Sequence, residues 1–186
     1  MTSVTPFKAT DLLHLTNVNL DTLTENYHAA FYLQYLTQWP SMFFKSENPN
    51  GEITGYMMGK SEGRGKEWHS HITAVTVAYD YRRLGLAGIL VDHLRQASEA
   101  PDQDCYFMDL YVRASNKLAI DMYKKFGFHV FRRVERYYGS GDNPNDAEDA
   151  FDMRWPMKRD ENNESLKKSA WTEESPYYRY RYEKLY

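Results

Sequence analysis

The chain has 186 residues, of which 42% are hydrophobic and 26% are charged, enough for one globular domain and too few for two ordinary ones. Its 23 Lys and Arg residues against 26 Asp and Glu residues give a net charge of −3, which argues against direct DNA binding. No segment approaches the roughly 20 apolar residues of a membrane span, no secretory signal is evident, and Cys105 is the only cysteine. We therefore expect a soluble, cytoplasmic protein without membrane association.

The first half of the chain has the hydrophobic pattern of alternating strands and helices. The expected elements are a strand at 4–8, a helix from about 12, a helix at 29–39, paired strands at 42–45 and 52–58, and a strand at 68–77. Asn48 to Gly51 reads as a turn between the paired strands, and Pro40 ends the helix before them. The helix at 29–39 is apolar nearly all round, which predicts burial on more than one side.

The second half continues the alternation up to a change in composition near residue 157. The expected elements are a helix at 86–97, a strand at 104–112, a helix at 116–126, a strand at 128–138, an acidic loop at 140–149 and a strand at 150–155. Together these predict an α+β fold, a mixed sheet flanked by helices with two strand-to-helix units near its centre. Residues 157–186 contain no Val or Ile and only two Leu, so we expect a domain at 1–156 followed by a polar, Tyr-rich tail.

The turn from Arg82 to Ala87 lies between a β-branched strand and an amphipathic helix. Small residues at Gly85 and Ala87 let the backbone approach a ligand, and the free amides of the helix's first turn favour an anion. Arg82 and Arg83 can add charge-assisted hydrogen bonds to that anion. By itself the pattern also fits an ordinary helix start with solvated arginines.

The surrounding sequence favours the anion site through a resemblance. Arg82-x-x-Gly85-x-Ala87, with Asn116 and Tyr123 in the next strand-helix unit, resembles the acetyl-CoA pyrophosphate loop of the GCN5-related N-acetyltransferase (GNAT) superfamily. Further segments, in order over residues 11–156, resemble the NatB class of protein N-terminal acetyltransferase catalytic subunits. These segments are NVNLDTLTENY, FYLQYLTQWP, GYMMGKSEG, WHSHITAVTV, YRRLGLA, RASNKLAIDMYKKFGF and RVERYY.

The resemblance implies the GNAT fold and a specific reaction. Acetyl-CoA would be the co-substrate, without a metal, and the acceptor would be the α-amine of Met in nascent chains that begin Met-Asp, Met-Glu, Met-Asn or Met-Gln. It also implies a heterodimer with a large helical-repeat auxiliary subunit, and association with ribosomes. The surface expected to meet that subunit is apolar and consists of residues 29–39 with Leu12, Leu13, Leu15, Val18 and Leu20.

Site residues carry over from the resemblance by position. The cofactor-binding residues would be Val75, Val77, Arg82, Arg83, Leu84, Gly85, Leu86, Ala87, Asn116 and Tyr123. The substrate-binding residues would be Glu25, Tyr27, His71, Thr73, Tyr137, Tyr138 and Gly139. The catalytic residues would be His71, Tyr123 and Glu25, and no metal ligand is expected.

The chemistry assigns roles to these side chains. An α-amine has a pKa of about 7.7–8.0 and must lose a proton before it attacks, so a weak base suffices, either His71 or Glu25. Tyr123 is the candidate donor to the leaving CoA sulfur, and a strand amide near Val75 the candidate for the oxyanion. His71 and Thr73 are two apart on a strand, so they share a face and can both donate to an acidic or amide second residue.

Plainer interpretations remain open for several of these residues. His71 and Thr73 also fit a satisfied core histidine and a strand former. Tyr137 and Tyr138 are adjacent on a strand and point to opposite faces unless a bulge turns both. For the whole chain, the alternatives are a GNAT enzyme for lysine side chains or small amines, and a non-catalytic scaffold of the same fold.

Other motifs carry weaker signals. Residues 55–61 are one residue short of a phosphate-binding loop and lie in a strand. His69 and His71 have metal-ligand spacing without an evident third ligand, and Cys105 reads as a small buried hydrophobe. The basic pairs at 124–125 and 132–133 are most simply solvated, although they could contact ribosomal RNA.

Overall fold

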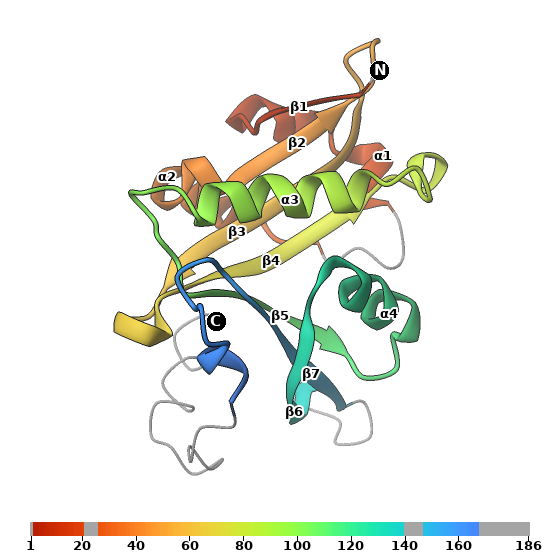
Figure 1. Cartoon of the computed structure of the whole chain (residues 1–186). Coiled ribbons are helices and arrows are strands. Elements are labelled where there is room, and N and C mark those ends of the chain that lie inside the picture. Colours follow the sequence, from red (N-terminus) through yellow and green to blue (C-terminus); the bar gives the residue numbers. More distant parts are fainter. Residues whose placement is uncertain (1, 21–25, 140–146, 168–186) are drawn as a thin grey trace.

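Within the residues that the structure describes, a single seven-stranded sheet in the order β1-β2-β3-β4-β5-β7-β6 forms the centre of the fold. This computed structural model describes residues 2–20, 26–139 and 147–167 (Figure 1). Neighbouring strands are antiparallel except β4 and β5, which are parallel. The mixed sheet flanked by helices confirms the predicted α+β class.

The element bounds follow the predicted order closely. The strands are β1 (Ser3–Pro6), β2 (Phe43–Glu47), β3 (Ile53–Glu62), β4 (His69–Val77), β5 (Phe107–Arg113), β6 (His129–Tyr138) and β7 (Glu148–Pro156). The α-helices are α1 (Thr16–Asn19), α2 (Ala29–Gln38), α3 (Leu86–Ser98) and α4 (Lys117–Phe126). None of the helices in these ranges is long and apolar enough to span a bilayer.

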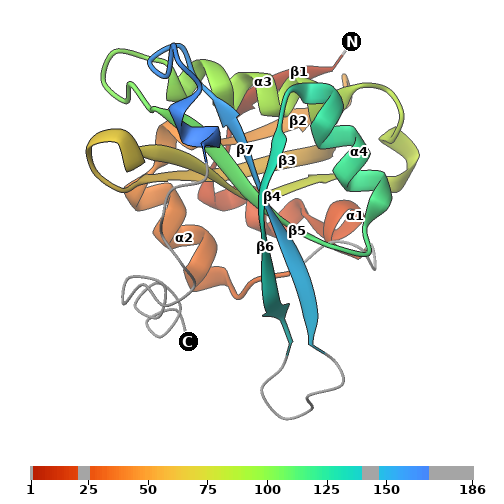
Figure 2. The ribbon, with the colours of Figure 1, turned by 60° about the horizontal axis from the view of Figure 1, so that its bottom comes forward.

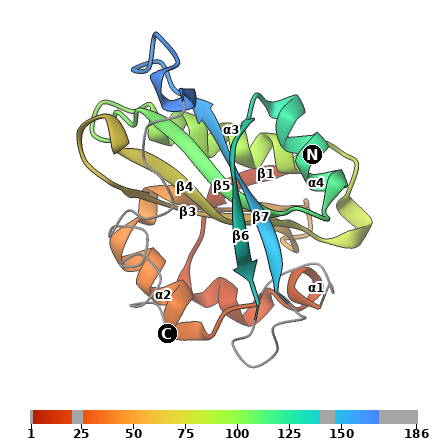
Figure 3. The same ribbon diagram turned by 90° about the horizontal axis from the view of Figure 1, so that it is seen from below.

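The helices divide between the two faces of the sheet, as Figure 3 shows. One apolar cluster joins α3 and α4 to the sheet through residues such as Leu90, Leu94 and Ile120. A second cluster joins α1 and α2 to the other face through Val18 and Tyr32. We call these the α3/α4 face and the α1/α2 face. At the sheet edge, β6 and β7 run side by side beyond β5 (Figure 2).

The parallel pairing of β4 and β5 is short. It runs from His69 opposite Phe107 to Ile72 opposite Leu110 and stops there, although β4 continues to Val77. The two strands diverge beyond that point, while each keeps its antiparallel partner on the other side. The β4–β5 ladder therefore ends at Ile72, and residues 73–77 of β4 extend beyond it.

A bulge in β4 lies at the point of divergence. Met58 of β3 pairs with Ala74 and Gly59 pairs with Ile72, so Thr73 is the extra residue. Because of it, Ala74 packs on the α1/α2 face, whereas Val75 packs on the α3/α4 face. Without the bulge, the period-2 alternation would place residues 71, 73, 75 and 77 on one face.

Close packing of α3 on β3 depends on a glycine. A Cβ atom at Gly59 would lie 2.9 Å from the two terminal carbons of Leu94, so a larger residue there would require the Leu94 side chain to shift. Leu94 itself is fully buried. β3, the neighbour of β4, is thus packed directly against α3.

Two regions differ from the prediction in more than the exact ends of an element. The helix expected from residue 12 is a 3-10 helix at Ala9–His14 followed by the short α1, because Asp11 is drawn inward to Lys45, 2.8 Å away. Past residue 156 the chain continues to pack. Met157 joins the α3/α4 cluster, and Asp160 accepts the backbone N–H groups of Glu164 and Ser165. Residues 168–186 lie outside the described part of the chain.

Truncation of the α3 contact tests this packing. We expect Leu94→Ala to lower the free energy of unfolding by about 2–5 kcal/mol, because it leaves a cavity between α3 and β3. Ile89→Ala, on the same helix but 46% exposed, should cost about 1 kcal/mol or less. Urea denaturation measures both, and equal losses would contradict the assigned packing.

Candidate functional site

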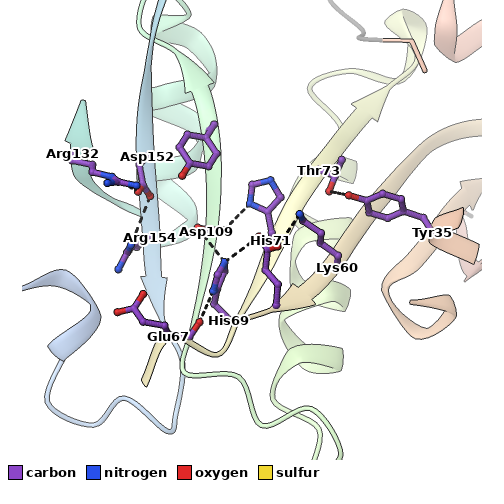
Figure 4. A network of polar contacts seen from close by, with 12 residues as sticks. Tyr35, Lys60, Glu67, His69, His71, Thr73, Asp109, Arg132, Asp152 and Arg154 are labelled. Atoms are coloured by element: carbon purple, nitrogen blue, oxygen red, sulfur yellow. Dashed lines mark hydrogen bonds and ion pairs between the residues drawn. The ribbon is translucent and has the colours of Figure 1, made fainter. Parts of the chain in front are cut away.

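A buried carboxylate on β5 organises the α1/α2 side of the divergence. Asp109 Oδ1 lies 2.7 Å from His71 Nδ1, and its Oδ2 lies 3.5 Å from His69 Nε2 (Figure 4). The Asp109 side chain is 2% exposed and that of His71 is 14% exposed. Burial alone would raise the pKa of Asp109, but the neighbouring His69 and His71 lower it below its ordinary value. Asp109 is therefore ionised at neutral pH and holds His71 in place.

Charged residues of β6 and β7 lie next to Asp109. Arg132 Nε donates to Asp152 Oδ2 at 2.9 Å. Arg154 lies opposite Asp109 in the ladder, with its guanidinium carbon 4.4 Å from the ring centroid of Phe107. These contacts stabilise a cluster of buried charges that would be costly to leave unpaired.

Thr73, the bulge residue, contacts α2. Its Oγ1 lies 2.8 Å from the hydroxyl of Tyr35, and either group can be the donor. Burial raises the pKa of Tyr35 to about 12, so this hydroxyl keeps its proton at neutral pH. His71 and Thr73 lie on the same side of the sheet (Figure 4), which confirms that the two predicted residues share a face.

Tyrosine side chains of β5 and β6 border this site next to His71. The Tyr111 ring lies 5.7 Å from His71 and stacks on Tyr137 at 4.6 Å. Tyr138 donates its hydroxyl to the Tyr111 carbonyl at 3.1 Å. A register shift between Val134 and Tyr138, with Arg136 at φ +53°, is the bulge that brings both adjacent tyrosines to Tyr111.

The loop expected to hold an anion lies at the start of α3. Gly85 is the residue before the helix and has φ +81°, with nothing within 4 Å of where a Cβ would be. The first bond into the helix is from Ile89 to the Gly85 carbonyl, so the amides of residues 86–88 have no acceptor within the helix. Arg82 donates Nε to the Val77 carbonyl at 3.1 Å, which ties the loop to the end of β4. This open helix start fits a phosphate group.

Residues of α4 and the end of β4 complete the α3/α4 side. Val75, Val77 and Tyr123 belong to the same apolar cluster. Asn116 is the N-cap of α4 and accepts the Ala119 amide at 3.1 Å, so its side chain also has a structural role. Tyr123 is 8% exposed, and desolvation raises the pKa of its hydroxyl above the ordinary value. The hydroxyl stays protonated at neutral pH.

Of the remaining predicted substrate-binding residues, the structure describes Tyr27 and Gly139. Tyr27 stacks on Phe31 at 4.6 Å, at the start of α2. Gly139 is exposed, next to Ala147 at the end of β6. Glu25 lies outside the described residues.

Sequence reasoning missed three residues of the site. Asp109 read as one polar residue in an apolar strand, Tyr111 as a strand aromatic, and Tyr35 as part of an apolar helix. Their roles depend on contacts between distant segments, such as Asp109 with His71. The one signal in the sequence was a carboxylate in a strand too apolar to bury it without partners.

The structure also bears on the histidines with metal-ligand spacing and on Cys105. Over residues 2–20, 26–139 and 147–167, no group of three His, Cys, Asp or Glu side chains is arranged to hold a metal ion. Cys105 is 1% exposed, as predicted for a buried hydrophobe, and burial raises the pKa of its thiol to about 12.

The raised pKa predicts a chemically inert thiol. At pH 8 the thiolate fraction of Cys105 would be about 10⁻⁴. We expect iodoacetamide to alkylate the native protein at least about 100-fold more slowly than the protein in urea, read by mass spectrometry. Glutathione under both conditions is the control, and native labelling at the glutathione rate would contradict burial of the thiol.

Comparisons with known proteins agree with this geometry. Residues 12–128 match the model of the acetyltransferase (GNAT) family. The chain is 51% identical over 173 residues to the N-terminal acetyltransferase B complex catalytic subunit of Schizosaccharomyces pombe, covering 91% of this chain and 93% of that one. It is also 51% identical over 166 residues to N-alpha-acetyltransferase 20 of Dictyostelium discoideum, covering 89% and 92%.

Solved structures show the same likeness. Naa20 of Chaetomium thermophilum, in complex with a bisubstrate analogue, superposes with a TM-score of 0.81 at 43% identity and covers 90% of this chain and 93% of its own. A chain of the NatB acetyltransferase complex bound to a bisubstrate inhibitor superposes with a TM-score of 0.76 at 49% identity, covering 84% and 91%.

Proposed function

Because the chain belongs to the GNAT acetyltransferase family and, within it, to the catalytic subunits of the N-terminal acetyltransferase B complex, we propose that it acetylates protein N-termini. Acetyl-CoA is the donor, and the acceptor is the α-amine of Met in chains that begin Met-Asp, Met-Glu, Met-Asn or Met-Gln.

The observation that carries the proposal is the divergence of β4 and β5 beyond Ile72 and Leu110. On the α3/α4 side lie the open amides of α3 and the apolar cluster with Val75 and Tyr123, which suit a pyrophosphate and a pantetheine chain. On the α1/α2 side lies the polar site with His71, which suits a peptide end. An acetyl group between the two sides can pass from the thioester to the amine.

The reaction then needs one bond made and one broken. The neutral α-amine attacks the thioester carbonyl carbon, the C–N bond forms, and the C–S bond breaks. His71 takes the amine's proton directly or through water, since its Nε2 is the ring nitrogen not bonded to Asp109. Glu25 is the alternative base.

Tyr123 stabilises the departing sulfur. A thiol has a pKa of about 8.5, and that of Tyr123 is raised above its ordinary 10 by burial. Full proton transfer from Tyr123 to the thiolate is therefore uphill. A hydrogen bond from its hydroxyl lowers the energy of the leaving anion without a transfer.

The proposal also includes a partner subunit and a cellular location. Leu13 and Leu20 are 80% and 79% exposed and Leu33 is 43% exposed, which supports docking of a helical-repeat auxiliary subunit on the α1/α2 side. Leu15, Val18, Tyr32 and Tyr35 are instead buried in the chain's own core. A cytoplasmic location with ribosome association follows from action on nascent chains.

A peptide panel tests the acceptor. We expect the chain with its auxiliary subunit to acetylate Met-Asp and Met-Asn peptides, and to lose at least about 100-fold in kcat/KM when the α-amine is blocked. Each peptide carries an internal lysine, and mass spectrometry locates the acetyl group. Acetylation of that lysine in the blocked peptides would support the lysine enzyme, and no transfer at all would support the scaffold.

Removal of the Tyr123 hydroxyl tests whether it stabilises the leaving sulfur. We expect Tyr123→Phe to lower kcat by about 100-fold while the peptide KM changes by less than about threefold, because the hydrogen bond forms only as the thiolate develops. Tyr106→Phe, which is 8% exposed like Tyr123 but lies away from α4, is the matched control. An unchanged kcat in Tyr123→Phe would exclude this role.

A further inference from the structure

Asp109 determines which nitrogen of His71 carries a proton. An ionised carboxylate only accepts hydrogen bonds, and Asp109 Oδ1 is 2.7 Å from His71 Nδ1. Nδ1 therefore carries a hydrogen and donates it to Asp109 Oδ1. In the neutral ring Nε2 then has a lone pair and accepts, whereas in the imidazolium it carries a hydrogen and donates.

This matters because the proposed substrates present opposite groups at the second residue. The NH₂ of Asn or Gln donates, so it is matched by the neutral ring of His71. The carboxylate of Asp or Glu only accepts, so two acceptors would face each other unless Nε2 gains a hydrogen. The Thr73 hydroxyl, 2.8 Å from that of Tyr35, can rotate to serve either substrate.

We propose that His71 takes up a proton when the second residue is acidic and stays neutral when it is an amide, with Asp109 as the positioning residue that makes both states available. This inference rests on the proposed function, with the alternative base, Glu25, taking the amine's proton, because Nε2 of His71 meets the second residue in both states. It explains how one pocket accepts acids and amides, since one proton reverses the polarity of Nε2 and leaves the His71 to Asp109 bond unchanged.

The groups around His71 allow its ring to change protonation state. Lys60, opposite His71 on β3, is paired with Glu62 at 3.0 Å. His69 lies on the same strand, with Nδ1 2.7 Å from the Glu67 carbonyl and Nε2 3.6 Å from Glu62.

The other neighbours are a cation and three phenols. Arg154 on β7 faces Asp109 from behind. The phenols are Tyr35 from α2, Tyr111 from β5 and Tyr137 from β6. Burial raises the pKa of Tyr35 to about 12, so this phenol keeps its proton. Among the described residues, Asp109 is the carboxylate bonded to the His71 ring. It stabilises an imidazolium while the aromatic rings limit access of water.

Calorimetry on the unmodified protein tests the proposal. The catalytic chain with its auxiliary subunit is saturated with CoA and titrated at pH 7.5 with peptides that differ only in Met-Asp or Met-Asn. Each titration is run in phosphate and in Tris, whose ionisation enthalpies differ, so the number of protons taken up follows from the two heats. Ionisation of the α-amine is common to both peptides and cancels in the difference.

We expect Met-Asp to take up close to one proton more than Met-Asn. Equal uptake would overturn the proposal, because the acidic side chain would then be held without protonation of His71. A parallel assay with acetyl-CoA in place of CoA separates the two proposals. If neither peptide is acetylated there, the proposed function fails, and if both are acetylated but take up equal numbers of protons on binding, only this inference fails.

A variant assigns the effect to Asp109. Asp109→Asn removes the charge that supports the imidazolium, so the uptake difference should fall toward zero and the KM of Met-Asp should rise at least about tenfold relative to that of Met-Asn, with similar kcat. Asp152→Asn changes another buried carboxylate, bonded to Arg132, and should retain the difference. A purely structural role for Asp109 would instead raise both KM values equally.

Discussion

The end of the parallel pairing between β4 and β5 is the constraint on which the rest of the structure depends. Once the two strands separate beyond Ile72 and Leu110, the sheet offers two unlike sides at one point. Helix starts and apolar residues meet there on the α3/α4 face, and charged and aromatic residues on the α1/α2 face. A reaction that joins a nucleotide thioester to a peptide amine requires such a meeting point, because each substrate must approach from its own side.

The bulge at Thr73 assigns strand residues to those two sides. In an unbroken strand, His71 and Val75 would point to the same face. The extra residue separates them, so the strand presents polar groups before the bulge and valines after it. The polar side then depends on buried charge. Asp109 is stabilised by the imidazoles of His69 and His71 and backed by Arg154, since an unpaired carboxylate at this depth would destabilise the fold.

Periodicity and turn residues were sufficient to predict the order of strands and helices from β1 to β7, and the resemblance named the loop before α3. Thr73 and Arg136 show the limit of such reasoning. Both bulges depend on partner-strand register, which local pattern does not contain, and the second decides that Tyr137 and Tyr138 both reach Tyr111. Asp109 was missed because its partner is 38 residues away in sequence. Residues 157–167 read as tail because their packing uses capping and ion pairs more than apolar residues.

The most direct test of the account is a crystal structure of the catalytic chain with its auxiliary subunit, bound to CoA joined to a Met-Asp peptide. The account predicts the CoA chain between β4 and β5 beyond Ile72 and Leu110, the pyrophosphate on the amides of residues 86–88, and the aspartate side chain within hydrogen-bond distance of His71. A conjugate whose peptide lies on the α3/α4 face, or whose aspartate does not contact His71, would contradict it.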